Sequence, residues 1–309
     1  MNLRDLRYIT ALADFGHFGK AAEACHVSQP TLSGQILKLE DELGVPLFER
    51  SGRALRPTAA GAEILIHARR AIAAADEIVA IGKASRDPLA GPLHLGIIPT
   101  LCPYLMPFVF PRLTKDLPSM PLVLHEDLTE RLIEGVSAGT LDAAIIASAP
   151  MSPALTSEIL FDEAFWLALP ANHKLAKKKT IATADIDPQT LLLLTDGHCL
   201  RDQALTLCGA PDLANGVSAD MRAASLETLL QMAAAGYGMT LVPALALAQQ
   251  KPLPKNLMIR KLKDPAMKRQ IRLISRAKYP RGKALEALGR LVKEAGERCP
   301  EDEITTYPA

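Results

Sequence analysis

The sequence predicts an α+β protein of several domains, and three observations lead to this prediction. A chain of 309 residues is long for one hydrophobic core, because single cores stop growing at roughly 250–300 residues. Apolar residues in the first part recur at helical spacing, and one long helical pattern follows. Beyond residue 92, short β-rich runs alternate with helical segments, which is typical of an α/β domain.

The charge of the chain limits the partners that it can attract. Lys and Arg number 35 and Asp and Glu 34, which leaves a net charge of +1. This balance excludes a bulk electrostatic attraction to nucleic acid or to a membrane, so contacts with nucleic acid must come from a few locally placed basic residues. The charged N-terminus is unlike a signal peptide, and proline and glycine interrupt both long uncharged stretches. We therefore expect a soluble, cytoplasmic protein without a membrane partner.

Residues 1–58 are predicted to form short helices joined by tight turns. Ser28 as N-cap, Pro30 in the first turn and Gly44 as C-cap delimit a helix that follows the Ala-rich stretch GKAAEAC. Two short helices joined in this way make a helix-turn-helix, and polar side chains on the second helix reach base edges and phosphates. These predicted DNA contacts are Gln29, Thr31, Ser33, Gln35 and Lys38.

The stretch FERSGRALRPT predicts a basic wing that lies against the DNA backbone. Arg50, Arg53 and Arg56 are spaced around Gly52 in it. The alternative is a small helical interaction module, because basic and acidic residues are equally numerous over residues 1–58. The helix-turn-helix pattern favours DNA.

Residues 59–86 form a single long helical pattern, and residues 87–92 read as a hinge rich in proline and glycine. Small and apolar residues repeat along the helix at spacings of three and four, as in a coiled coil. We expect dimerisation through this stripe, and the alternative is an intramolecular connector. The stripe comprises Leu65, Ala68, Ile72, Ala75, Val79 and Gly82.

Residues 93–309 are predicted to form an α/β domain in two lobes with a ligand cleft between them. The predicted strands are LHLGIIP, MPLVLHED, LDAAIIAS, FWLALP, LLLLTDG and MTLVPA. Two of the five cysteines, Cys199 and Cys208, lie in one short stretch of this domain. His198 directly precedes the first of them. A structural staple, a metal site, a catalytic pair and two unrelated buried thiols are all open interpretations. The absence of C-x-x-C and H-x-x-x-H patterns speaks against a metal.

The stretch FGKAAEACHVSQPTLSGQILKLEDELGVPLFER resembles the N-terminal winged helix-turn-helix of LysR-type transcriptional regulators. The linker helix, the hinge and the two-lobed domain are similar to that family along the whole chain. Within the family, GPLHLGIIPT, HEDLTE, DGHCLRDQA and SLETL resemble its peroxide-sensing members. The resemblance implies a periplasmic-binding-protein-like regulatory domain and places Pro30 on the recognition helix.

The resemblance also implies roles for individual residues. Cys199 matches the thiol that reacts with hydrogen peroxide, and Cys208 matches the thiol that closes a disulfide with it. The implied protein is a homotetramer built from dimers, and it uses no cofactor. It binds promoter DNA, activates antioxidant genes through RNA polymerase and is reset by a thioredoxin- or glutaredoxin-type reductant. Residues implied around the peroxide are Thr100, Thr129 and His198, with Arg201 and Asp202 in support.

Two cysteines depart from the pattern of the peroxide-sensing members. Cys102 follows Thr100 closely, where we expect it either to pack inertly or to compete for a mixed disulfide. Cys299 lies in a C-terminal tail that matches nothing in the family.

Peroxide chemistry at Cys199 requires a stabilised thiolate, since the thiolate is the nucleophile. A helix that starts at Thr195 or Asp196 would place Cys199 near its positive end. If the segment to Cys208 stays helical, a rise of roughly 1.5 Å per residue separates the two Cα atoms by about 13 Å. A disulfide needs a Cα separation of roughly 4.4–6.8 Å, so oxidation would have to unravel the segment.

Two other functions are compatible with these residues. The first is a LysR-type regulator that binds a small-molecule effector reversibly in the inter-lobe cleft, with incidental cysteines. The second is a thiol peroxidase, because its first half-reaction is the same. The helix-turn-helix favours a regulator, and we do not expect an enzyme.

Overall fold

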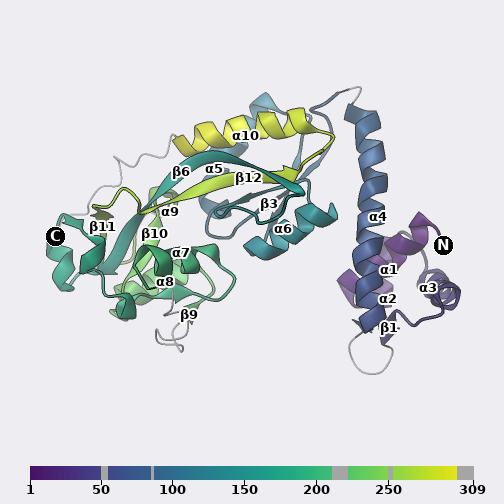
Figure 1. The fold of residues 1–309 in the computed structure, drawn as a ribbon, viewed down its shortest axis with the longest axis horizontal. Helices are drawn as coiled ribbons and strands as arrows, with labels where there is room; N and C mark the ends of the chain where they lie inside the picture. Colours follow the sequence, from purple (N-terminus) through teal and green to yellow (C-terminus); the bar gives the residue numbers. More distant parts are fainter. Residues whose placement is uncertain (50–54, 85–86, 211–221, 250–252, 298–309) are drawn as a thin grey trace. The chain divides into compact units, whose positions relative to one another are not determined.

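The computed structural model describes residues 1–49, 55–84, 87–210, 222–249 and 253–297. They form two compact units, the first from Met1–Asp87 and the second from Pro88–Ser137 together with the chain from Leu141 onward. The ribbon in Figure 1 shows helices and a small hairpin in the first unit and a large mixed sheet in the second. The α+β multidomain class is confirmed. Among the described helices, none has the length and apolar character to span a membrane.

The first unit is a helical bundle with a two-stranded wing. Ser28 caps α3 by accepting a hydrogen bond from the Thr31 backbone N–H, and Gly44 ends the helix at a φ of 70°, as predicted. Leu32, Ile36 and Leu39 form the buried side of this helix. The elements are α1 (Leu3–Phe15), α2 (Phe18–Ala24), α3 (Gln29–Leu43), β1 (Phe48–Glu49), β2 (Arg56–Pro57) and α4 (Ala59–Ala84).

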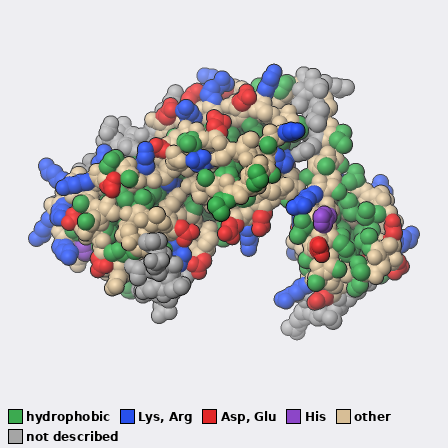
Figure 2. All heavy atoms as spheres, viewed as in Figure 1, with side chains coloured by type: hydrophobic (Ala, Val, Ile, Leu, Met, Phe, Trp, Pro, Cys, Tyr) green, Lys and Arg blue, Asp and Glu red, His purple; other side chains and the backbone are tan. Residues whose placement is uncertain are grey.

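Helix α4 corrects the predicted apolar stripe in its first half. Leu65 and Ala68 are buried in the core of their own unit, where α1 packs on α4, and they are not available to a second chain. The C-terminal half of α4, called its far half below, differs, because Ile78 and Val79 are 71% and 54% exposed. Hydrophobic side chains are visible on the surface of this unit in Figure 2. A dimer contact along α4 must therefore use the far half of the helix.

The second unit is organised around an eight-stranded sheet in the order β4-β3-β5-β12-β6-β11-β7, with β10 also paired to β6. Strand β3 is parallel to β4 and to β5, whereas β12 is antiparallel to β5 and to β6. The strands of this sheet are β3 (Leu93–Ile97), β4 (Leu122–Glu126), β5 (Ala143–Ile146), β6 (Leu155–Pro170), β7 (Thr180–Ile181), β10 (Thr240–Pro243), β11 (Leu257–Leu262) and β12 (Lys268–Arg276).

Strand β6 belongs to both lobes of this unit. Its first part pairs with β12, and its last part pairs with β10 and β11. The prediction found only the end of this 16-residue strand and missed β11 and β12. All six predicted β-rich runs contain a strand. The run LLLLTDG contains β8 (Leu193–Leu194), which pairs in parallel with β9 (Arg222–Ala223), a strand outside the predicted runs. The two-lobed α/β architecture is thus confirmed, with β6 as a continuous connection.

Helices cover the sheet and carry the segments that concern function. Helix α10 (Gly282–Glu297) packs on β6 and on α5 (Cys102–Asp116), as Figure 1 shows. Helix α5 contains Pro107 and Pro111, and the stretch LHLGIIPTLCPYLMPFVFP forms a strand, a turn and a helix. The remaining helices are α6 (Thr129–Ala138), α7 (Cys199–Leu207), α8 (Leu226–Ala234) and α9 (Ala244–Gln249), with three short 3-10 helices at Lys174–Lys177, Thr183–Asp185 and Pro188–Thr190.

Candidate functional site

Cys199 is the first residue of helix α7 and lies at its positive end. The N-cap is His198, which corrects the expectation that the helix starts at Thr195 or Asp196. The adjacent Leu200 backbone N–H lowers the pKa of the Cys199 thiol. The thiol is half-buried, so a small molecule can reach it.

Two threonines follow adjacent parallel strands, and one of them, Thr129, acts on the thiol at this helix end. Thr129 begins α6 just after β4, and its side chain lowers the pKa of the Cys199 thiol. The buried Thr129 hydroxyl has no hydrogen-bond partner among the described residues. Thr100 lies just after β3 and is also buried, but its hydroxyl accepts a hydrogen bond from Arg269 Nη1 at 3.0 Å. A second Arg269 nitrogen binds the Thr100 carbonyl at 3.0 Å.

Arg269 is the residue of this site that the sequence did not reveal. It lies on β12 opposite Glu163 of β6, and its guanidinium pairs with the Glu163 carboxylate at 2.8 Å. Glu163 is fixed in turn, because its second oxygen accepts a hydrogen bond from the Leu245 N–H at 3.0 Å. The guanidinium charge lowers the pKa of Cys199 from a strand far away in the sequence.

The pKa of Cys199 nevertheless lies above the ordinary thiol value, because burial outweighs all other effects. Arg269, the Thr129 hydroxyl and the Leu200 N–H act in the opposite direction, and the Asp202 carboxylate adds to the rise. The resting residue is therefore a protonated thiol with anion-stabilising groups already around it.

His198 was predicted to lie around the peroxide, with Arg201 and Asp202 in support. Burial lowers the pKa of His198, which keeps its ring neutral at neutral pH. Arg201 is buried and pairs with Asp196 at 3.1 Å and with Asp202 at 3.3 Å. Its charge is thus matched by carboxylates, and Arg269 supplies the cation that acts on Cys199.

Cys199 lies on the wall of a cavity of about 780 Å³. Gln203, one turn further along α7, also lines it and donates a hydrogen bond to the Ala147 carbonyl at 2.7 Å. The other amide atom, Gln203 Oε1, is buried without a hydrogen-bond partner among the described residues, so an acceptor is available beside the thiol. Thr129, Arg201 and Asp202 line the same cavity.

The other cysteines differ from Cys199 in burial and in partners. Cys208 caps the C-terminal end of α7, so the whole helix lies between the two thiols, and burial raises the pKa of Cys208 to about 11. Cys102 begins α5, where burial and the Glu126 carboxylate raise its pKa to about 12. All cysteines that the structure describes are free thiols. Cys299 lies outside the described residues.

Most of the predicted DNA contacts fall on one helix. Gln29, Pro30, Thr31 and Lys38 are exposed on α3, and Ser33 and Gln35 are half-buried there. Arg50 and Arg53 lie outside the described residues, so the tip of the wing stays a prediction.

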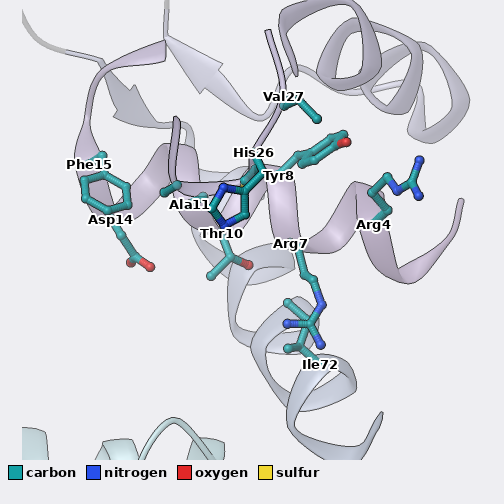
Figure 3. Close-up of a pocket in the computed structure, with 12 residues that line it drawn as sticks. Arg4, Arg7, Tyr8, Thr10, Ala11, Asp14, Phe15, His26, Val27 and Ile72 are labelled. Carbon is teal, nitrogen blue, oxygen red and sulfur yellow. The ribbon is translucent and has the colours of Figure 1, made fainter. Parts of the chain in front are cut away.

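The first unit also has a hollow of about 770 Å³, which none of the predicted DNA contacts lines. Figure 3 shows how side chains of α1, of α4 and of the turn before α3 surround it. Arg7, which lines the hollow, pairs with Asp76 at 2.6 Å, and both side chains are about half exposed. No sequence pattern indicated this hollow.

Comparison with known proteins identifies both units. Residues 3–62 match the family described as bacterial regulatory helix-turn-helix protein, lysR family, and residues 86–297 match the LysR substrate binding domain. A hydrogen peroxide-inducible genes activator of Dickeya chrysanthemi is 42% identical over 95% of each chain.

Two solved structures are similar over nearly the whole chain. A full-length OxyR variant from Pseudomonas aeruginosa has a TM-score of 0.77 and 38% identity, covering 95% of this chain and 98% of that one. A hydrogen-peroxide-bound cysteine mutant of Corynebacterium glutamicum OxyR has a TM-score of 0.66 and 32% identity, covering 96% and 93%. This chain therefore belongs to the LysR family of bacterial transcription regulators, and within that family to the OxyR group.

Proposed function

We propose that this protein is a DNA-binding transcriptional regulator that senses hydrogen peroxide through Cys199. The observation that carries the proposal is the position of the thiol, half-buried on a cavity wall with the Thr129 hydroxyl and the Arg269 charge beside it. The similarity to peroxide-inducible activators supports the same conclusion. Membership of a family of transcription regulators favours this function over a peroxidase.

The first chemical step is attack of the Cys199 thiolate on one peroxide oxygen. The S–O bond forms as the O–O bond breaks, and the departing hydroxide takes a proton to become water, which leaves a sulfenic acid on Cys199. Hydroxyl groups both donate and accept, so Thr129 and Thr100 suit a small ligand that does the same. Arg269 stabilises the thiolate before attack and the hydroxide during it.

The second step joins Cys199 to Cys208. The Cys208 sulfur attacks the sulfenic sulfur, the S–S bond forms, and the hydroxyl group leaves as water, so two thiols and one peroxide give one disulfide and two waters. The two cysteines stand at opposite ends of α7, about 13 Å apart at the usual helical rise. Closing the bond therefore requires α7 to unravel, which makes this helix the two-state element of the switch.

The refolded segment alters the packing of regulatory domains, and the linker helix transmits the change to DNA. We assign residues 1–58 to DNA binding, 59–86 to the linker helix, 87–92 to a hinge and 93–309 to regulation. Dimers form along the exposed far half of α4 and assemble into tetramers on promoter DNA, where the oxidised form engages RNA polymerase. A thioredoxin- or glutaredoxin-type reductant restores the thiols.

The direct test is titration of the reduced protein with one equivalent of hydrogen peroxide, followed by alkylation and peptide mass mapping. We expect a Cys199–Cys208 disulfide that is lost in Cys199→Ser and in Cys208→Ser. Cys25→Ser is the matched control, since Cys25 is a half-buried thiol of the other unit and its loss should change nothing.

A disulfide between Cys199 and Cys102 would leave peroxide sensing in place and make Cys102, in place of Cys208, the second thiol of the switch. If both thiols stay free while promoter binding persists, the proposal is wrong.

A reversible effector is the second candidate, and the size of the cavity favours it. About 780 Å³ is far more than hydrogen peroxide occupies and falls within the roughly 300–1,000 Å³ of small-molecule sites. The variant Cys199→Ser discriminates between the two candidates. It abolishes the response of a peroxide sensor, whereas a regulator that binds an effector reversibly keeps its response. Promoter footprints with and without peroxide would measure the response.

A further inference from the structure

Two histidines on neighbouring strands bring ring nitrogens close together outside the Cys199 site. His94 lies on β3 and His125 on β4, and the distance between His94 Nδ1 and His125 Nε2 is 3.3 Å. The ring centroids are 5.6 Å apart, and the ring planes are inclined by 27°. Neither residue lines the cavity at Cys199.

The register of the strands explains why the two rings meet. In the parallel pair β3–β4, His94 lies opposite Val123 and Gly96 lies opposite His125. Alternation along a strand puts His94 and Gly96 on the same face, so the residue beside His125 has no side chain to separate the rings. Leu132 lies where a Gly96 side chain would be, which keeps this position closed to larger residues. Strand β4 is the edge of the sheet, and the His125 side chain is exposed there.

The spacing of the nitrogens matches two ligands of one metal ion. Zinc–imidazole bonds of about 2.0–2.1 Å in tetrahedral geometry place two ligand nitrogens about 3.3–3.4 Å apart. We propose that His94 and His125 bind one divalent late transition ion, of the zinc or nickel class, at the β3–β4 edge. Imidazole suits these ions. Among the described residues, no group of three His, Cys, Asp or Glu side chains forms a metal site, so the protein supplies two ligands here. Water completes the coordination shell.

The protonation of the pair agrees with this role. Two facing ring nitrogens must share one proton to make a hydrogen bond, and an ion replaces that proton by binding both lone pairs. The backbone N–H of His94 donates to Asp142 at 2.7 Å, which fixes the strand at this point.

The ion would join the two strands that lead to the threonines near Cys199. Thr100 follows β3, and Thr129 follows β4, each only a few residues beyond its histidine. A metal bridge between these strands limits their separation without touching the thiol. The proposal does not depend on peroxide sensing, because it concerns binding alone.

The test is calorimetric titration of the reduced full-length protein with NiCl₂. We expect one ion per chain, with affinity at least about tenfold weaker in His94→Ala and in His125→Ala, as is usual when metal coordination is damaged. His67→Ala is the control, since His67 is an exposed histidine on α4 and its loss should leave binding unchanged. All three variants keep every cysteine, so binding to thiols cancels in the comparison.

A second variant separates loss of the ligand from loss of the fold. His125→Gln keeps a polar side chain of similar size at an exposed position, and circular dichroism checks that it is folded. Folded His125→Gln that binds nickel as tightly as the wild type would overturn the proposal. So would a wild type that binds no nickel, because the pair would then be a hydrogen-bonded contact only.

Discussion

Arg269 and Glu163 face each other across β12 and β6, and their side chains, 0% and 2% exposed, pair at 2.8 Å. The same guanidinium holds Thr100 through two hydrogen bonds and acts on the pKa of Cys199. One buried ion pair thus supports both the junction of the strands and the environment of the thiol. The pair is costly to break, because the remaining partner is left as a buried, uncompensated charge.

Glu163→Gln should therefore destabilise the protein strongly. We expect a loss of about 3–5 kcal/mol in the free energy of unfolding, the cost of leaving one member of a buried pair alone. Urea unfolding followed by circular dichroism measures it. The matched control is Asp162→Asn, which breaks the neighbouring pair with Lys268 on the same two strands. That pair is 39–47% exposed and should contribute less than about 1 kcal/mol. Equal losses in both variants would contradict the argument.

The reaction of Cys199 with peroxide should accelerate with pH. Because burial holds the pKa of this thiol above its ordinary value, the thiolate fraction rises about tenfold per pH unit between about pH 6 and 8. Arg269→Gln removes a cation that lowers this pKa, so its rate should be slower at each pH. Stopped-flow measurement with Lys261→Gln as a charge-matched control checks both points. A rate that does not vary with pH would refute the assignment of a protonated resting thiol.

Cys102 should make the protein sensitive to alkali. Its pKa is 9.0 unperturbed and about 12 in the folded protein, where burial and the Glu126 carboxylate disfavour the anion. The unfolded chain loses this proton first, so stability falls as pH rises from about 9 to 12, by up to about 4 kcal/mol. Cys102→Ala should flatten that part of the stability curve. Chemical unfolding at several pH values measures the free energy of unfolding of the wild type and of Cys102→Ala. If this free energy falls equally steeply with pH in both proteins, the fold does not hold the Cys102 thiol in its protonated form.

Two glycines of α4 provide a matched pair. A Cβ on Gly61 would lie 2.0 Å from the Leu47 carbonyl oxygen, whereas a Cβ on Gly82 would meet nothing within 4 Å. Gly61→Ala should therefore destabilise the first unit by about 1–3 kcal/mol through overpacking and weaken DNA binding. Gly82→Ala should be neutral or stabilising by about 1 kcal/mol, because alanine favours a helix. Thermal unfolding and a promoter-binding assay compare them, and a stable, DNA-binding Gly61→Ala would contradict the packing.

Local signals in the sequence were sufficient for the first unit. Ser28 and Gly44 mark the ends of α3, because capping depends on residues within one turn of the helix end. The stripe on α4 was found, but the residues that cover its first half were not. Periodicity shows which residues need burial and leaves open what covers them, and here α1 covers Leu65 and Ala68.

The candidate site was only partly accessible to the same reasoning. Cys199 and Cys208 share one helix, so a short stretch of sequence contains both. Arg269 could not be found in this way, because its importance arises from the pairing of β12 with β6 and from no pattern in its own segment. The alternation in β12 also went unnoticed, since charged residues interrupt it.

The order of these residues along the chain has a consequence for the newly made protein. Strand β6 joins the two lobes, but its partner β12 comes near the end of the second unit. Ribosomes make Thr100, Thr129 and Cys199 well before Arg269, so a nascent chain exposes its thiol without the guanidinium that tunes it. The chemical character of Cys199 is therefore set only after translation has passed β12, and the mature reactivity belongs to the completed fold.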